Sequence, residues 1–98
     1  MALNREQVVA LLQAHRREIA SFGVASLSLF GSMARDEAGF ESDVDVLVEF
    51  VGPTTFRAHV GLIVYLETLL GRRVDVTTRA MLPPEVAESA AAEMLRVA

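Results

Sequence analysis

The chain has 98 residues, of which 52% are hydrophobic, a formal net charge of −4 and no cysteine. This length predicts a single domain over residues 1–98. The absence of cysteine excludes a disulfide framework or a thiolate metal site. The negative charge argues against direct nucleic-acid binding, because that affinity depends on neutralising phosphates. No signal peptide or membrane-spanning run is visible, so a cytoplasmic protein is expected, and part of its apolar surface is expected to face a partner.

The first predicted element is a helix. Asn4 and Gln7 have the spacing of a capping box, in which each side chain satisfies a backbone amide at the helix start. Apolar residues then recur at helical spacing, with His15 among them. The pattern predicts one amphipathic helix from about residue 4 to residue 21, with His15 as a packing residue.

Two strands follow this helix. Residues 26–29 alternate polar and apolar with a period of two, which predicts a half-buried strand. Gly31 and Ser32 end it, and one short helical turn is expected over residues 33–37. The same alternation predicts a second strand over residues 43–50. Because only about a dozen residues connect the two strands, we expect an antiparallel pair.

A long helix is predicted next. Thr54 or Thr55 caps its start, and it reaches Leu70, after which Gly71 stands where a C-cap glycine belongs. We interpret its apolar stripe as core packing. The buried stripe is expected to consist of Phe56, Val60, Ile63 or Val64, and Leu70.

The last predicted elements are a strand over residues 73–77 and a helix opened by Pro83 and Pro84. The apolar positions of this helix are Val86, Ala90 and Met94 or Leu95. We expect this helix to contact a partner. The order is helix, strand, short turn, strand, helix, strand, helix, which predicts an α/β (α+β) fold with a small mixed three-stranded sheet flanked by helices.

Asp43 and Asp45 are the first candidates for chemistry. They lie two residues apart in a predicted strand, so their side chains point to the same side. Two nearby carboxylates raise each other's proton affinity unless a cation lies between them. Hard oxygen ligands without cysteine favour Mg²⁺ or Mn²⁺ over zinc. The alternative is a solvated face, and these two residues alone do not distinguish it from a metal site.

Asp75 is a third carboxylate in an apolar strand. A parallel crossover through the long helix would bring it beside Asp43 and Asp45. Three carboxylates could then converge on two metal ions, an arrangement that clamps a triphosphate and aligns an in-line displacement.

Gly31 and Ser32 are candidates for binding phosphate. A glycine directly after an apolar strand, followed by serine and a helical turn, exposes backbone N–H groups beside a hydroxyl. Arg35 could add a guanidinium fork on a phosphate. The alternative is an ordinary strand-to-helix turn with Arg35 as a surface charge.

Gly31 and Ser32, ten intervening residues, and Asp43-x-Asp45 together resemble the signature of the DNA polymerase beta-type nucleotidyltransferase superfamily. The stretch "LFGSMARDEAGFESDVDVLVEF" resembles the minimal branch, the MNT proteins, and the resemblance resumes at "LLGRRVDVTT". One departure is Asp36, where the family usually has glycine. This extra negative charge puts the strength of nucleotide binding in doubt.

The resemblance implies a nucleotidyltransferase fold in which Gly31 and Ser32 hold the phosphates of ATP. Asp43 and Asp45 would bind two Mg²⁺ ions, and Asp75 would help to hold one ion and activate the attacking hydroxyl. The implied reaction transfers AMP from ATP to a hydroxyl and releases pyrophosphate. Proteins of this branch pair with a HEPN ribonuclease toxin, which they silence by binding it and adding AMP to a toxin tyrosine.

Two other functions are compatible with these residues. One is a non-catalytic antitoxin that neutralises its partner by occlusion, which Asp36 favours and the three carboxylates argue against. The other is an enzyme that modifies a small molecule such as an aminoglycoside, with a partner chain supplying the acceptor site. The identity of the acceptor separates this possibility from protein modification.

Overall fold

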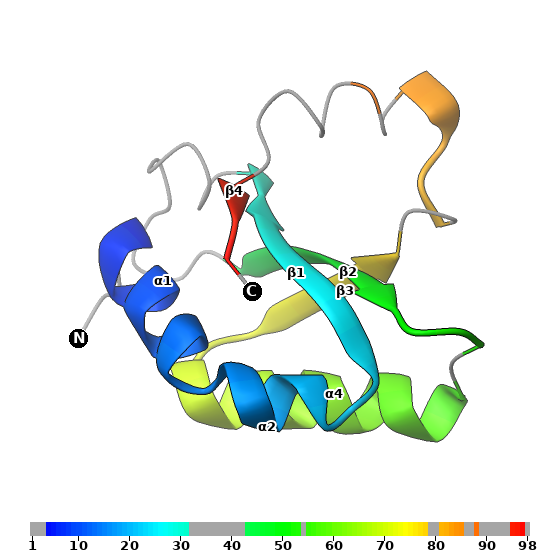
Figure 1. The fold of residues 1–98 in the computed structure, drawn as a ribbon. Coiled ribbons are helices and arrows are strands. Elements are labelled where there is room, and N and C mark those ends of the chain that lie inside the picture. Colours follow the sequence, from blue (N-terminus) through cyan, green and yellow to red (C-terminus); the bar gives the residue numbers. More distant parts are fainter. Residues whose placement is uncertain are drawn as a thin grey trace.

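The computed structural model describes residues 4–31, 43–53, 55–78, 81–85, 88 and 95–97 (Figure 1). Its elements in chain order are α1 (Arg5–Ala14), α2 (Arg16–Ala20), β1 (Val24–Phe30), β2 (Val44–Phe50), α4 (Phe56–Leu70), β3 (Val74–Thr78) and β4 (Leu95–Arg96). Within these described ranges, every helix is too short or too polar to cross a bilayer.

The strands form one mixed sheet in the order β3-β2-β1-β4. Strand β1 is antiparallel to β2, and β2 is parallel to β3. The mixed three-stranded sheet and the antiparallel first pair are therefore confirmed. The short strand β4 extends the sheet at its β1 edge and is antiparallel to β1.

Strand β4 corrects the prediction for the C-terminal region. Pro84, Glu85 and Glu88 have helical backbone, but Leu95 pairs with β1 instead of ending a helix. The backbone N–H of Val97 also donates to the carbonyl of Leu27 at 2.9 Å. Free hydrogen-bonding groups at the edge of β1 thus override the local helical pattern. Val86, Ala90 and Met94, which were expected on this helix, lie outside the described residues.

The N-terminal helix begins as predicted but does not run as one piece. The Asn4 side chain accepts from the Gln7 N–H at 2.8 Å, and the Gln7 side chain accepts from the Asn4 N–H at 3.0 Å. At His15 the backbone leaves helical geometry, with φ −112° and ψ 22°, and separates α1 from α2. The Nδ1 atom of His15 lies 2.9 Å from the carbonyl oxygen of Leu11, which also accepts the His15 backbone N–H at 3.2 Å.

Helix α4 has the predicted caps. Thr55 accepts a hydrogen bond from the Ala58 N–H at 3.0 Å, and Gly71 ends the helix with a φ of 65°. A positive φ of this size favours glycine, since a Cβ atom would strain it. Thr54, the other predicted cap, lies outside the described residues.

The buried stripe of α4 differs from the prediction. Its buried residues are Leu62, Leu66 and Leu70. Of the residues expected inside, Leu70 is buried, Ile63 is partly buried, and three are exposed: Phe56, Val60 and Val64. Nearly the whole circumference of this helix is apolar, so periodicity alone does not select the face that meets the sheet.

The core lies on one face of the sheet, where α1, α2 and α4 gather (Figure 1). Alternate residues of the strands pack against the buried side chains of the helices to form this core. Its buried members include Val8, Leu12, Ile19, Leu27, Leu29, Val44, Val46, Val48, Leu62, Leu66, Leu70, Val74 and Val76. The side chains between these strand positions point to the opposite face, which carries the candidate site.

Candidate active site

A row of residues crosses the sheet on the face opposite the helices. Asp45 of β2 is the direct partner of Phe30 on β1 and of Asp75 on β3. Direct partners in neighbouring strands point to the same face. Asp43 lies two residues before Asp45, so it belongs to the same side of β2. The structure thus brings together the three carboxylates singled out in the sequence.

These carboxylates interact electrostatically. Asp45 is half-buried, whereas Asp43 and Asp75 are exposed. Burial raises the pKa of the Asp45 carboxyl above its usual value of 3.8, and the negative charges of Asp75 and then Asp43 raise it further. Each charge therefore makes ionisation of Asp45 more costly, and a cation between them would relieve this cost.

Gly31 lies directly against Asp45. It follows the last residue of β1 and has a φ of 70°, a conformation that favours glycine. A Cβ atom at this position would lie 2.6 Å from Oδ2 of Asp45, closer than such atoms approach. Glycine is therefore required here by conformation and by space. The sequence predicted an exposed backbone at this turn, but it did not reveal the contact with the carboxylate.

The other predicted phosphate-binding residues cannot be placed. Ser32 and Arg35 lie outside the described residues, as does Asp36, the departure from the family pattern. Of the residues predicted to bind phosphate, the structure thus describes Gly31 alone.

The carboxylates fit a hard divalent cation in charge and donor type. They supply only oxygen, and the two histidines lie elsewhere: His15 between α1 and α2, and His59 beside the ring of Phe50. Among the residues that the structure describes, no three carboxylate, histidine or cysteine side chains are already arranged to hold a metal.

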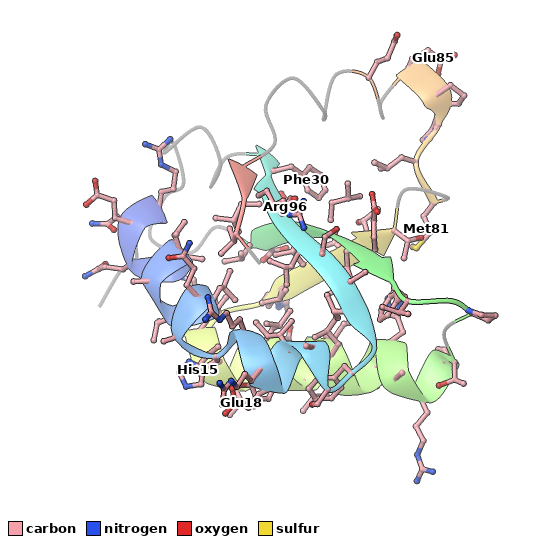
Figure 2. All side chains as sticks on the ribbon, in the orientation of Figure 1. His15, Glu18, Phe30, Met81, Glu85 and Arg96 are labelled. Atoms are coloured by element: carbon pink, nitrogen blue, oxygen red, sulfur yellow. The ribbon has the colours of Figure 1, made fainter. Side chains whose placement is uncertain are left out.

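Phe30 and Arg96 are neighbours of the site that the sequence did not reveal. Phe30 belongs to the row of Asp45 and Asp75, and Arg96 of β4 pairs with Ser28, two residues earlier on β1. Figure 2 shows Phe30 and Arg96 near each other at the same end of β1. Arg96 is exposed and adds a cation to an acidic face. Its place depends on a long-range strand pairing that leaves no local signal in the sequence.

The chain is similar to known proteins in sequence and in fold. Residues 12–97 match the family described as the nucleotidyltransferase domain. The chain is 38% identical over 96 residues to the protein adenylyltransferase MntA of Thermococcus cleftensis, with 97% of each chain covered.

Solved structures agree with this assignment. A structure solved as that of a minimal nucleotidyltransferase superposes with a TM-score of 0.84 at 35% identity, over 95% of each chain. A chain from the complex of a tri-AMPylated HEPN toxin with an MNT antitoxin of Shewanella oneidensis gives a TM-score of 0.66 at 15% identity, over 92% of this chain and 71% of that one. The second likeness shows the fold alone. The chain therefore belongs to the nucleotidyltransferase domain family and, within it, to the minimal nucleotidyltransferases.

Proposed function

We propose that this protein is an Mg²⁺-dependent enzyme that transfers AMP from ATP to a tyrosine hydroxyl of a HEPN ribonuclease toxin and thereby acts as its antitoxin. The observation that carries the proposal is the row of Asp45 and Asp75, with Asp43 beside it and Gly31 against it. The name of the MntA relative and the AMPylated toxin in the Shewanella complex support protein modification.

The position of each carboxylate would determine its role in metal binding. Asp43 and Asp45 would hold two divalent ions, Mg²⁺ or Mn²⁺, and Asp75 would hold one of them. Bound ions would neutralise the triphosphate and polarise the phosphorus under attack. Because Asp75 is exposed, its carboxylate is accessible to a hydroxyl that arrives from outside the chain.

Side chains of this protein would then promote a single displacement, in which the tyrosine hydroxyl replaces pyrophosphate on the α-phosphorus of ATP. Asp75 accepts the proton of the tyrosine hydroxyl, and the oxygen of that hydroxyl forms a bond to the α-phosphorus of ATP. The bond from the α-phosphorus to the bridging oxygen breaks, and pyrophosphate leaves. Gly31 and Ser32 would hold the phosphates, with Arg35 as a further phosphate ligand.

Intact mass spectrometry of the partner tests this proposal. A co-expressed HEPN-domain protein is incubated with ATP, Mg²⁺ and either the native protein or an Asp43→Asn/Asp45→Asn variant. We expect mass increments of whole AMP units with the native protein and none with the variant. An unmodified partner whose ribonuclease activity is still blocked would contradict transfer and indicate occlusion instead.

A further inference from the structure

An apolar ridge runs along the outer side of α4. It consists of Phe56, Val60 and Val64, whose exposed fractions are 85%, 38% and 57%. Residues four apart lie on one side of a helix, so the three side chains are neighbours on the surface. Contiguous exposed apolar surface marks places where another molecule binds. This ridge is thus a candidate interface.

The ridge presents little polarity. Between Arg57 and Glu67 the helix carries no charged residue. At its C-terminal end the Thr68 hydroxyl donates to the carbonyl oxygen of Val64 at 2.8 Å, so its hydrogen is already used within the helix. A partner surface that covers the ridge would need apolar groups in the middle and a charge at each end.

We propose that the ridge of α4 packs against the ridge of α4 in a second copy of this chain, with the two helices antiparallel. In this pairing, position 62 of one helix lies level with position 62 of the other. Val60 then lies opposite Val64 of the other copy. Phe56 then faces Thr68, and Arg57 faces Glu67. A two-fold interface must be complementary to itself, and this helix satisfies that condition in apolar shape and in charge.

The end charges select the antiparallel arrangement. Parallel helices in register would place Arg57 against Arg57 and Glu67 against Glu67, which is unfavourable. In the antiparallel pair, Arg57 of one copy meets Glu67 of the other at each end of the interface. Arg57 is exposed, and Glu67 uses Oε2 to accept the Val74 N–H at 3.1 Å, so Oε1 remains to accept from Arg57.

The proposed contact leaves the candidate active site open. Helix α4 covers the apolar face of the sheet, whereas the carboxylates lie on the other face (Figure 1). Pairing through α4 is therefore independent of the chemistry on that face. One helix pair buries less than the roughly 1,200–2,000 Å² of a stable interface, so the dimer should be weak and depend on concentration.

Sedimentation over a range of protein concentrations tests the pairing. We expect the native protein to shift from monomer toward dimer. Arg57→Glu and Glu67→Arg should each weaken self-association about tenfold, because two opposite-charge pairs become like-charge pairs. An equimolar mixture of the two variants should associate again, since opposite charges then meet at both ends. If each variant dimerises like the native protein, or if the mixture stays monomeric, the proposed register is wrong.

A second pair of variants tests the apolar contact. Val64→Lys should abolish association, whereas Met81→Lys, at a side chain with an exposed fraction of 61% outside α4, should leave it unchanged. Circular dichroism of both variants checks that the fold is kept. A native protein that is monomeric at its highest attainable concentration would overturn the proposal, as would equal association of the two lysine variants.

Discussion

The two faces of strand β2 carry side chains with opposite effects on stability. Val44, Val46 and Val48 point to the helices and are fully buried. Asp43 and Asp45 point the other way, where burial and the negative charges of Asp75 and Asp43 make the ionised state of Asp45 costly. One face therefore contributes stability through packing, whereas the other holds like charges together at a cost.

This difference indicates which face serves folding and which serves chemistry. Selection for stability alone would not retain neighbouring carboxylates whose charges oppose each other. Substitutions on the helical side should change the free energy of unfolding, and those on the acidic side should change activity. Substitutions on each face measure how completely the effects on stability and on activity separate.

The largest effect on stability is expected on the helical side. Leu66 is fully buried in α4, so Leu66→Ala should lower the free energy of unfolding by about 2–5 kcal/mol through lost burial and a cavity. Urea denaturation measures this value. Val51→Ala, at an exposed side chain, should change it by less than about 0.5 kcal/mol. Equal losses in both variants would contradict the assignment of the core.

The largest effect on activity is expected on the acidic side. Asp45→Asn keeps the shape of the side chain but removes its charge, so AMP transfer should fall by at least about a hundredfold. Its free energy of unfolding should be unchanged or higher. Glu49→Gln, four residues along the same face, is the matched control and should retain transfer. Comparable losses of transfer in both variants would argue against a specific role for Asp45.

A smaller effect on stability is expected at Gly31. Gly31→Ala would introduce a Cβ atom 2.6 Å from Oδ2 of Asp45 and strain a positive φ, which should cost about 1–3 kcal/mol of stability. Gly52→Ala is the matched control, because Gly52 has a φ of 69° but no atom within 4 Å of its added Cβ. Thermal unfolding gives both values. If they are equal, the contact with Asp45 is not what requires glycine.

The smallest effect is a dependence of stability on pH. Because the folded-state pKa of Asp45 is raised, its protonated form favours folding, and this contribution is lost as the pH rises from 3.8 through the raised value. In the presence of a chelator, the native protein should therefore lose stability relative to Asp45→Asn over this range. Added Mg²⁺ should reduce the difference at neutral pH. A pH-independent difference would contradict the raised pKa.

The sequence predicted the elements whose signals are local. The capping box at Asn4, the cap at Thr55 and the C-cap glycine at Gly71 each act within one helical turn, and all three are confirmed. The positions of Asp43 and Asp45 on one face followed from the period of two in a strand. The alignment of Asp45 with Asp75 needed only a parallel crossover, which the structure contains.

Features that depend on distant partners were not predicted. The face of α4 that meets the sheet is set by tertiary packing, since Phe56 and Val64 are as apolar as the buried Leu62. Leu95 joins β1 through hydrogen bonds to residues far away in the sequence. The contact of Gly31 with Asp45 likewise depends on how two strands pack. No pattern within a short window encodes these choices.

Calorimetric titration with a non-hydrolysable ATP analogue tests the central claim most directly, because it requires no partner. The acidic face is expected to bind the nucleotide together with divalent ions. The native protein should therefore bind the analogue with Mg²⁺, and binding should be lost with a chelator or in the Asp43→Asn/Asp45→Asn variant. Equal binding by the native protein and this variant, or binding that does not depend on Mg²⁺, would contradict the assignment of this face as a metal-dependent nucleotide site.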